Sequence, residues 1–277
     1  MINGLIKLGM ISSCKIFMNK MNYFDLKGLN IFVSGASGHL GSKISYYLAE
    51  AGAKVYLNGR NIKKLNEVNN LILKNGFLSQ ISRFDIQNKN ALKKFFKTNP
   101  TNIIINNAYH SDRANMLLTK SSKLYKYKNI DIIKNVIELG KKNLIISAKH
   151  KQKSAIINIS SMYSVVSPNP KNYTNKNQKG NVEYGIEKLA INKLTKYYAA
   201  ELGRHQIEVN NLIPGAFPNP KIIKRYPKFI NNLKKNSALK KIGYPDDLIT
   251  SILFLSSKYT RFITGTDIVI DGGWTVF

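Results

Sequence analysis

Short runs of β-branched and apolar residues alternate with longer helical patterns from Leu29 onward, and this alternation constrains the fold more than any other feature. Strands separated by helices form βαβ units, which build a parallel sheet with helices on both faces. We therefore predict an α/β protein with a doubly wound parallel sheet of about seven strands. The predicted strands are Ile31–Ser34, Lys54–Leu57, Gln80–Phe84, Asn102–Ile105, Ser154–Ile159, Ile207–Ile213 and the first part of Asp267–Gly273.

The chain reads as a single domain with a short extension in front of it. Its 277 residues fit one large α/β unit, and neither an internal repeat nor a linker interrupts residues 24–277. Residues 1–23 are predicted to be a loose N-terminal extension, with a translation start at Met18 or Met21 as an alternative. Residues 216–244 carry three prolines around a basic helical pattern, which predicts a movable lid over a substrate.

The charge of the chain is strongly positive. There are 43 Lys and Arg residues against 15 Asp and Glu residues, which gives a formal net charge of +28. This charge suits nucleic acid, anionic lipid or an anionic substrate. However, the lysines are spread along predicted helices, which favours solvated helix faces over a surface for polyanions. We therefore expect no nucleic-acid partner, while an anionic substrate or a phosphorylated cofactor would benefit from the field.

Cysteine content and hydropathy bear on location. Cys14 is the single cysteine, so an internal disulfide and a cysteine-cluster metal site are both excluded. No apolar run approaches the ~18 residues that are needed to span a bilayer. We expect a cytoplasmic protein without a metal site and without a membrane partner, because a reducing compartment is the simplest one for such a chain.

A glycine-rich turn follows the first predicted strand. Residues Gly35 to Gly41 read Gly-x-x-Gly-x-x-Gly, and the segment that follows is helical from Ile44 to Glu50. Glycines let the backbone turn tightly, and the free N–H groups of the new helix can bind a pyrophosphate. The spacing departs from the Gly-x-Gly-x-x-Gly fingerprint, so a plain structural turn remains an alternative. For His39 we expect a backbone role beside a cofactor, not a catalytic one.

The end of the second predicted strand bears on the choice of cofactor. In NAD-binding folds an acid here holds the ribose hydroxyls, whereas this chain has Asn58, Gly59 and Arg60. A guanidinium in place of a carboxylate favours a 2′-phosphate, so we predict NADP over NAD, with NAD still possible. An Arg60 that is merely exposed to solvent is the alternative.

Polar residues also follow the next two strands. Asp85 and Ile86 come directly after the third strand and are placed to line an adenine pocket. Asn107 and Ala108 come directly after the fourth strand, where short side chains suit a backbone held against a ligand. A simple turn is the alternative for this second pair.

A tyrosine and a lysine lie four residues apart after the fifth strand. Tyr184 and Lys188 are i and i+4, so on a helix both side chains project from one face. A nearby cation favours the phenolate, which makes a tyrosine a usable acid or base near neutral pH. Ser161 lies just after this strand and could hold a substrate oxygen by a hydrogen bond. The spacing alone is weak evidence, because Tyr23 and Lys27 share it.

The loop and the helix around this pair also carry signals. Residues 162–181 form a loop that is long enough to suggest a function rather than a simple connection. Asn181 is a plausible N-cap for a helix from Val182 to Leu202, and Gly203 is a plausible stop.

These pieces in this order resemble the short-chain dehydrogenase/reductases, a family of single-domain enzymes with a Rossmann-type fold. The resemblance runs from about Phe24 to Phe277. Its markers are the turn from Ser34 to Gly41, Asp85-Ile86, Asn106-Asn107-Ala108, Asn158 to Ser161, Tyr184-x-x-x-Lys188, Pro214-Gly215 and Asp271 to Trp274. Each marker is common, but all of them in register are highly specific, and Tyr23 falls before the first strand.

The resemblance implies a role for each matching residue. Tyr184 would exchange a proton with the substrate, Lys188 would bind the nicotinamide ribose and favour ionisation of Tyr184, and Ser161 would polarise the substrate carbonyl. Asn135 is the candidate for the family asparagine that anchors a proton-relay water. The implied cofactor residues are Gly35, Ser37, Gly38, His39, Leu40, Gly41, Arg60, Asp85, Ile86, Asn107, Ala108, Tyr184, Lys188, Pro214, Gly215 and Phe217. Members of the family commonly pair their long helices, which implies a homodimer or a homotetramer.

Three departures from the family pattern should alter the site without removing it. His39 stands where many members have glycine, Tyr109 replaces the glycine of Asn-Ala-Gly, and the loop between Ser161 and Tyr184 is longer than usual. The sequence around this loop resembles bacterial oxidoreductases of flagellin modification and surface-sugar biosynthesis. We therefore expect interconversion of a secondary alcohol and a ketone on a sugar or sugar-phosphate precursor.

Three alternative functions remain open at this point. A 3-oxoacyl thioester reductase would also tolerate a basic entrance to its site. A dinucleotide-binding regulatory or scaffold protein without turnover is disfavoured by the intact set of Ser161, Tyr184 and Lys188. A polyanion-binding protein would show steep salt dependence of binding.

Overall fold

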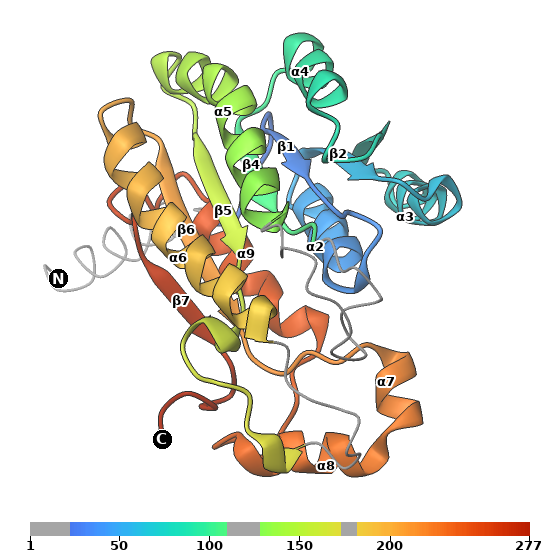
Figure 1. The fold of residues 1–277 in the computed structure, drawn as a ribbon. Coiled ribbons are helices and arrows are strands. Elements are labelled where there is room, and N and C mark those ends of the chain that lie inside the picture. Colours follow the sequence, from blue (N-terminus) through green and yellow to red (C-terminus); the bar gives the residue numbers. More distant parts are fainter. Residues whose placement is uncertain (1–22, 110–127, 173–181) are drawn as a thin grey trace, which may run out of the picture.

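The computed structural model describes residues 23–109, 128–172 and 182–277, and its centre is a parallel sheet of seven strands (Figure 1). The strand order β3-β2-β1-β4-β5-β6-β7 places β1 and β4 side by side at the point where the order reverses. The predicted doubly wound sheet is therefore confirmed. The strands are β1 (Asn30–Val33), β2 (Lys54–Gly59), β3 (Leu78–Arg83), β4 (Ile103–Asn106), β5 (Ala155–Ile159), β6 (Glu208–Pro214) and β7 (Asp267–Ile270).

Helices cover both faces of the sheet. One face packs against α2 (His39–Glu50), α3 (Ile62–Lys74) and α9 (Ile249–Ser256) through an aliphatic core cluster. The other face packs against α4 (Lys89–Thr98), α5 (Lys128–Lys149) and α6 (Val182–Gly203) through a second cluster that is rich in phenylalanine. Strands β1, β4, β5 and β6 are buried almost throughout, as expected for a parallel sheet that is covered on both sides.

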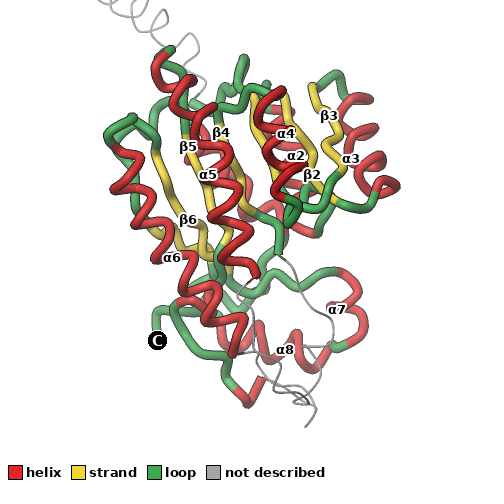
Figure 2. Tube along the Cα trace, turned by 45° about the horizontal axis from the view of Figure 1, so that its top comes forward, coloured by secondary structure: helices red, strands yellow, loops and turns green. Residues whose placement is uncertain are grey.

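Residues 216–244, which were predicted to be a lid and are called the lid segment below, lie beyond the end of the sheet toward which β5 points (Figures 1 and 2). The lid segment contains α7 (Pro220–Arg225) and α8 (Pro227–Asn236), and each helix begins with a proline, which is favoured at the first helical position. A small cluster of Met162, Ile230, Leu233, Ile242 and Trp274 attaches the segment to the rest of the chain. The lid segment therefore rests on its own satellite core.

One helix boundary differs from its prediction, and another agrees with it. Helix α2 begins at His39, inside the glycine turn, and not at Ile44, because the glycines hide the helical pattern from the sequence. The stop of α6 at Gly203 is confirmed. The predicted N-cap Asn181, Cys14, residues 1–22 of the extension and residues 173–181 of the long loop lie outside the described residues. No helix in the part of the chain that the structure describes is long and apolar enough to cross a bilayer.

Candidate active site

The glycine turn after β1 approaches its neighbours so closely that side chains are excluded. A Cβ at Gly41 would lie 2.2 Å from the carbonyl oxygen of Gly35, and Gly35 has a φ of +66°, which favours glycine. Gly38 is the N-cap of α2 and has no side chain to satisfy the first N–H groups of that helix. The turn therefore presents bare backbone donors at the carboxyl end of β1.

The chain after β4 holds this turn in place. The Nδ2 group of Asn107 donates to the carbonyl oxygens of Ser34 at 3.0 Å and Gly35 at 3.1 Å. The Ser34 hydroxyl accepts hydrogen bonds from the backbone N–H groups of Asn107 and Ala108, both at 3.0 Å. The side chain of Asn107 is thus used to tie two strand ends together, and Ser34, which was not among the predicted site residues, is its partner.

At the end of β2, Arg60, which was predicted to favour NADP, meets Asp85, which was predicted to line an adenine pocket. The Arg60 guanidinium lies 3.7 Å from a carboxylate oxygen of Asp85, and both side chains are largely exposed. Asn58 is buried and donates to the carbonyl oxygens of Ser82 and Phe84, so it fixes the edge of β2 against β3. Arg60 is consequently the exposed cation at the position where a carboxylate would select NAD.

His39 connects the glycine turn to the chain after β6. A hydrogen bond to the backbone of Pro218 raises the pKa of His39, but burial lowers it more, so the net shift of this pKa is downward. The ring therefore favours the neutral form, and its Nε2 atom is buried without a hydrogen-bond partner in the part of the chain that the structure describes. His39 thus has a side-chain contact that the sequence did not predict.

The remaining predicted cofactor residues lie around the same edge. Gly215 follows β6, where a Cβ would lie 2.6 Å from the Cα atom of Asp271. The ring of Phe217 packs over Gly243 within the lid segment. Leu40 and Ile86 pack against the two large core clusters, and Pro214 is the last residue of β6. Ser37 lies beside Gly59.

Ser161, Tyr184 and Lys188 converge at the carboxyl end of β5. Ser161 is buried two residues after the end of β5, and Tyr184 and Lys188 lie in the first two turns of α6. Burial raises the pKa of Tyr184, while a hydrogen bond with the Ser161 side chain acts in the opposite direction. The predicted trio is therefore brought into direct contact.

Lys188 is buried among neutral groups. Its ammonium donates to the carbonyl oxygen of Ile159 at 2.8 Å and lies 5.2 Å from the ring centroid of Tyr109 and 5.7 Å from that of Tyr184. Burial lowers the pKa of Lys188 to about 8, and the charge of Glu187 partly opposes this shift. Such a cation stabilises a nearby phenolate.

Three further residues bear on this site. The ring of Tyr109 meets Tyr184 edge to face, with centroids 5.1 Å apart, so the tyrosine in place of the family glycine contacts the predicted catalytic pair. Asn135 is half-buried on α5, and none of the hydrogen bonds in the described residues links it to Tyr184 or Lys188. Asn129, about 9 Å earlier along the same helix, instead contacts Glu187 on α6.

A parallel sheet with a glycine turn at the start of a helix, beside a serine, a tyrosine and a lysine, defines a dinucleotide-binding oxidoreductase. The model of the family described as enoyl-(acyl carrier protein) reductase matches residues 35–275. The chain belongs to the short-chain dehydrogenase/reductase family, as the sequence motifs predicted.

Curated relatives span almost the full chain at low identity. The gluconate 5-dehydrogenase of Gluconobacter oxydans is 28% identical over 94% of this chain and 99% of its own length. The 3-oxoacyl-(acyl-carrier-protein) reductase of Rickettsia typhi is 27% identical, covering 90% and 98%. The post-translational flagellin modification protein A of Campylobacter coli is 26% identical, covering 88% and 97%.

A solved structure supports the same fold. The gluconate 5-dehydrogenase of Burkholderia cenocepacia, in complex with NADP and tartrate, superposes with a TM-score of 0.76 at 24% identity, covering 92% of this chain and 98% of its own. The chain is similar to these proteins over its whole dinucleotide-binding fold.

Proposed function

We propose that the protein is an NADP-dependent oxidoreductase that interconverts a secondary alcohol and a ketone on a sugar or a sugar-derived acid. The observation that carries this proposal is the meeting of Ser161, Tyr184 and Lys188 at the carboxyl end of β5. A nicotinamide cofactor would supply the hydride, and the protein would supply orientation and the proton.

Each member of the trio has a task that its surroundings support. Tyr184 would give or take the proton of the substrate oxygen, and Ser161 would hold that oxygen by a hydrogen bond. Burial raises the pKa of Tyr184, so its ionisation near neutral pH depends on a nearby positive charge, which Lys188 provides. Lys188 would also bind the nicotinamide ribose, and Asn135 remains our proposed anchor for a relay water.

The cofactor site is proposed to be the edge formed by the glycine turn and the ends of β2 to β6. The bare backbone donors at Gly38 and the excluded Cβ at Gly41 fit a pyrophosphate held against the start of α2. Arg60 would bind the 2′-phosphate of NADP, which is the dinucleotide named in the Burkholderia cenocepacia complex. NAD remains the alternative cofactor.

The substrate class is proposed from the relatives and from charge. Two of the relatives are named for gluconate or for flagellin modification, which supports a sugar acid or a sugar-phosphate precursor of surface glycans. The lid segment would close over such a substrate, and its helices carry many cations that favour an anion. These cations are Lys221, Lys224, Arg225, Lys228, Lys234 and Lys235.

Substitution of Tyr184 by Phe tests the chemistry. The variant keeps the ring that packs on Tyr109 but removes the hydroxyl, so we expect kcat to fall by about 10²- to 10⁴-fold with NADPH affinity retained. Turnover is followed by NADPH absorbance, and affinity by NADPH fluorescence. Turnover equal to that of the wild type would overturn the assignment.

A 3-oxoacyl thioester reductase is the second candidate, and the relative from Rickettsia typhi favours it. A panel of keto-sugar acids, sugar phosphates and 3-oxoacyl thioesters, assayed with NADPH under one set of conditions, separates the two. A higher kcat/KM for the thioesters would replace the sugar proposal while leaving the roles of Tyr184 and Lys188 intact.

We also propose that the protein forms a homodimer or homotetramer through α6. Four apolar side chains on this helix remain 44–67% exposed, and their spacing follows the helical repeat. These residues are Val182, Ile186, Leu189 and Tyr197. Sedimentation of the wild type against Leu189→Lys tests this, and a wild-type monomer would contradict it.

A further inference from the structure

Glu187 on α6 is a carboxylate with no solvent exposure. Its relative accessible surface is 0%, and it lies between Tyr184 and Lys188 in the sequence. Burial of a charged group is expensive unless that group is paired or hydrogen-bonded. A carboxylate at this position therefore calls for a physical reason.

Both carboxylate oxygens of Glu187 accept hydrogen bonds from one residue of the neighbouring helix. The backbone N–H of Asn129 donates to Oε1 at 3.2 Å, and the Nδ2 group of Asn129 donates to Oε2 at 2.7 Å. Asn129 lies in the first turn of α5, where backbone N–H groups lack helical partners and the helix dipole favours a negative charge. Glu187 thus caps α5 from α6 and joins the two helices beside the active site.

Glu187 also supplies negative charge to the surroundings of Lys188. The titratable groups that the elements around Lys188 carry closest in sequence or space are Tyr184 and Glu187 on α6, Tyr109 after β4, Tyr163 after β5, and Lys128 next to Asn129 on α5. The carboxylates of Glu183 in the first turn of α6 and Asp131 in the first turn of α5 are exposed, whereas Glu187 is buried and is the carboxylate whose charge acts on Lys188. Its charge opposes the burial that lowers the pKa of Lys188 to about 8, and Ile159 offers only a neutral carbonyl oxygen.

We propose that Glu187 is a positioning residue with two tasks, which are to keep Lys188 protonated and to hold the first turn of α5 against α6. Its effect on turnover rests on the function proposed for Tyr184 and Lys188. Its effects on the charge of Lys188 and on the order of α5 do not, so they can be measured without a substrate.

The charge task is tested by Glu187→Gln, which keeps the shape and one acceptor oxygen but removes the charge. Glu183→Gln is the matched control, because it removes an exposed carboxylate from the first turn of the same helix. Protein with 13C-labelled lysine is titrated by NMR, and the Lys188 signal is assigned by its loss in Lys188→Met.

We expect the titration midpoint of Lys188 to fall by about half a pH unit or more in Glu187→Gln, because one nearby opposite charge is lost, and to stay unchanged in Glu183→Gln. The basic limb of the pH profile of kcat should shift in the same direction. Equal midpoints in wild type and Glu187→Gln would overturn the charge task.

The anchoring task is tested by Asn129→Ala, which keeps the carboxylate but removes its side-chain donor. Hydrogen exchange at the start of α5 should become at least about tenfold faster, because a local opening loses a charge-assisted hydrogen bond. The titration midpoint of Lys188 should stay near that of the wild type. Unchanged exchange would overturn the anchoring task. If the wild-type protein shows no activity on any substrate but the two variants show the expected changes in titration midpoint and hydrogen exchange, the proposed reaction is refuted and this inference stands.

Discussion

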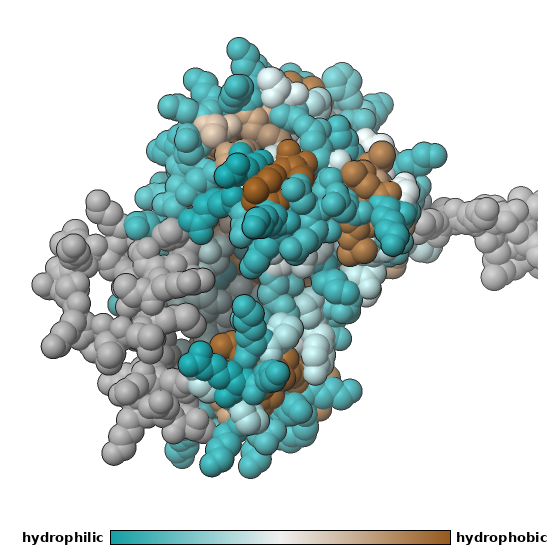
Figure 3. Space-filling model, turned by 90° about the vertical axis from the view of Figure 1, so that its right-hand side faces the viewer, coloured by the Kyte–Doolittle hydropathy of each residue, from teal (hydrophilic) through white to brown (hydrophobic). Residues whose placement is uncertain are grey.

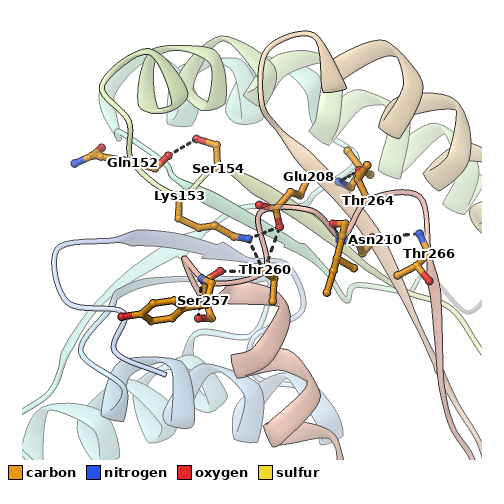
Figure 4. A network of polar contacts seen from close by, with 12 residues as sticks. Gln152, Lys153, Ser154, Glu208, Asn210, Ser257, Thr260, Thr264 and Thr266 are labelled. Carbon is orange, nitrogen blue, oxygen red and sulfur yellow. Dashed lines mark hydrogen bonds and ion pairs between the residues drawn. The ribbon is translucent and has the colours of Figure 1, made fainter. Parts of the chain in front are cut away.

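Two buried lysines lie at opposite ends of β5, and they are held in different ways. Lys153 precedes the strand, and its ammonium contacts the carboxylate of Glu208 and the hydroxyl of Thr260, which is 2.8 Å away (Figure 4). Lys188 lies beyond the other end and contacts the carbonyl oxygen of Ile159 and two tyrosine rings. No carboxylate among the described residues lies within ion-pair distance of Lys188.

The difference separates a cation paired with a carboxylate from one whose direct partners are neutral, and it supports the proposed role of Lys188. The hydroxyl of Thr260 also donates a hydrogen bond to Glu208, so Lys153, Glu208 and Thr260 satisfy one another at the start of β5. The cation at the end of β5 keeps only neutral direct partners and can still interact with a bound molecule. Perturbed groups of this second kind cluster at functional sites.

The largest expected effect is on stability, at the start of β5. Lys153→Met would leave Glu208 buried without its cation, so we expect the free energy of unfolding to fall by about 3–5 kcal/mol. Urea denaturation measures this. The double variant Lys153→Met, Glu208→Leu should regain most of the loss, because an apolar pair of similar volume replaces the ion pair. If Lys153→Met is as stable as the wild type, Lys153 is not a structural cation and does not differ from Lys188 in this respect.

Lys188→Met tests the other end and should affect activity more than stability. We expect kcat/KM to fall by about 10²-fold, which corresponds to about 2.7 kcal/mol of transition-state stabilisation. The loss in unfolding free energy should be clearly smaller than for Lys153→Met, because no directly paired carboxylate is left behind. Steady-state kinetics and urea denaturation on the same preparation decide this. A variant that unfolds easily but keeps its activity would reverse the comparison.

Local patterns made most of the fold predictable from the sequence. The apolar runs that became β1, β4 and β5 are buried on both faces and differ from the predicted ranges by one residue. Tyr184 and Lys188 lie on the same helix, so their spacing in the sequence was enough to predict that their side chains share a face. Figure 3 shows a face of the molecule on which hydrophilic residues predominate.

Contacts between distant segments were not predictable. Glu187 and Asn129 are 58 residues apart, and Lys153 and Glu208 are 55 apart. Sequence spacing carries no signal for such pairs, because helix packing and strand order choose the partners. The pattern after β4 likewise predicted a backbone held against a ligand, whereas the Asn107 side chain also ties the glycine turn.

The dependence of stability on pH gives a subtler test of the Lys188 end. Burial lowers the pKa of Lys188 from 10.5 to about 8, so between these values the unfolded chain binds more protons than the folded one. The free energy of unfolding should therefore rise with pH in this window, by at most about 1.4 kcal/mol per pH unit, and this gain is lost as the pH falls through 8. Urea denaturation at pH 8 and 9.5 should show the gain for the wild type relative to Lys188→Met. Parallel behaviour of the two proteins would contradict the lowered pKa.

The smallest expected effect concerns Arg60 and Asp85, an ion pair at the same end of the sheet that is exposed and 3.7 Å long. Exposed pairs contribute about 0–1 kcal/mol, so Arg60→Glu should change stability little. The substitution should instead change the choice of cofactor. We expect the ratio of NADPH to NADH affinity to fall by about tenfold, or about 1.4 kcal/mol. The reason is that a carboxylate repels a 2′-phosphate but accepts hydrogen bonds from the ribose hydroxyls of NADH. Fluorescence titration with both cofactors measures the ratio, and Arg83→Glu, an exposed arginine of β3, is the matched control. An unchanged ratio would mean that Arg60 is only a solvated surface charge and that the polar carboxyl end of the sheet is functional at β5 but not at β2.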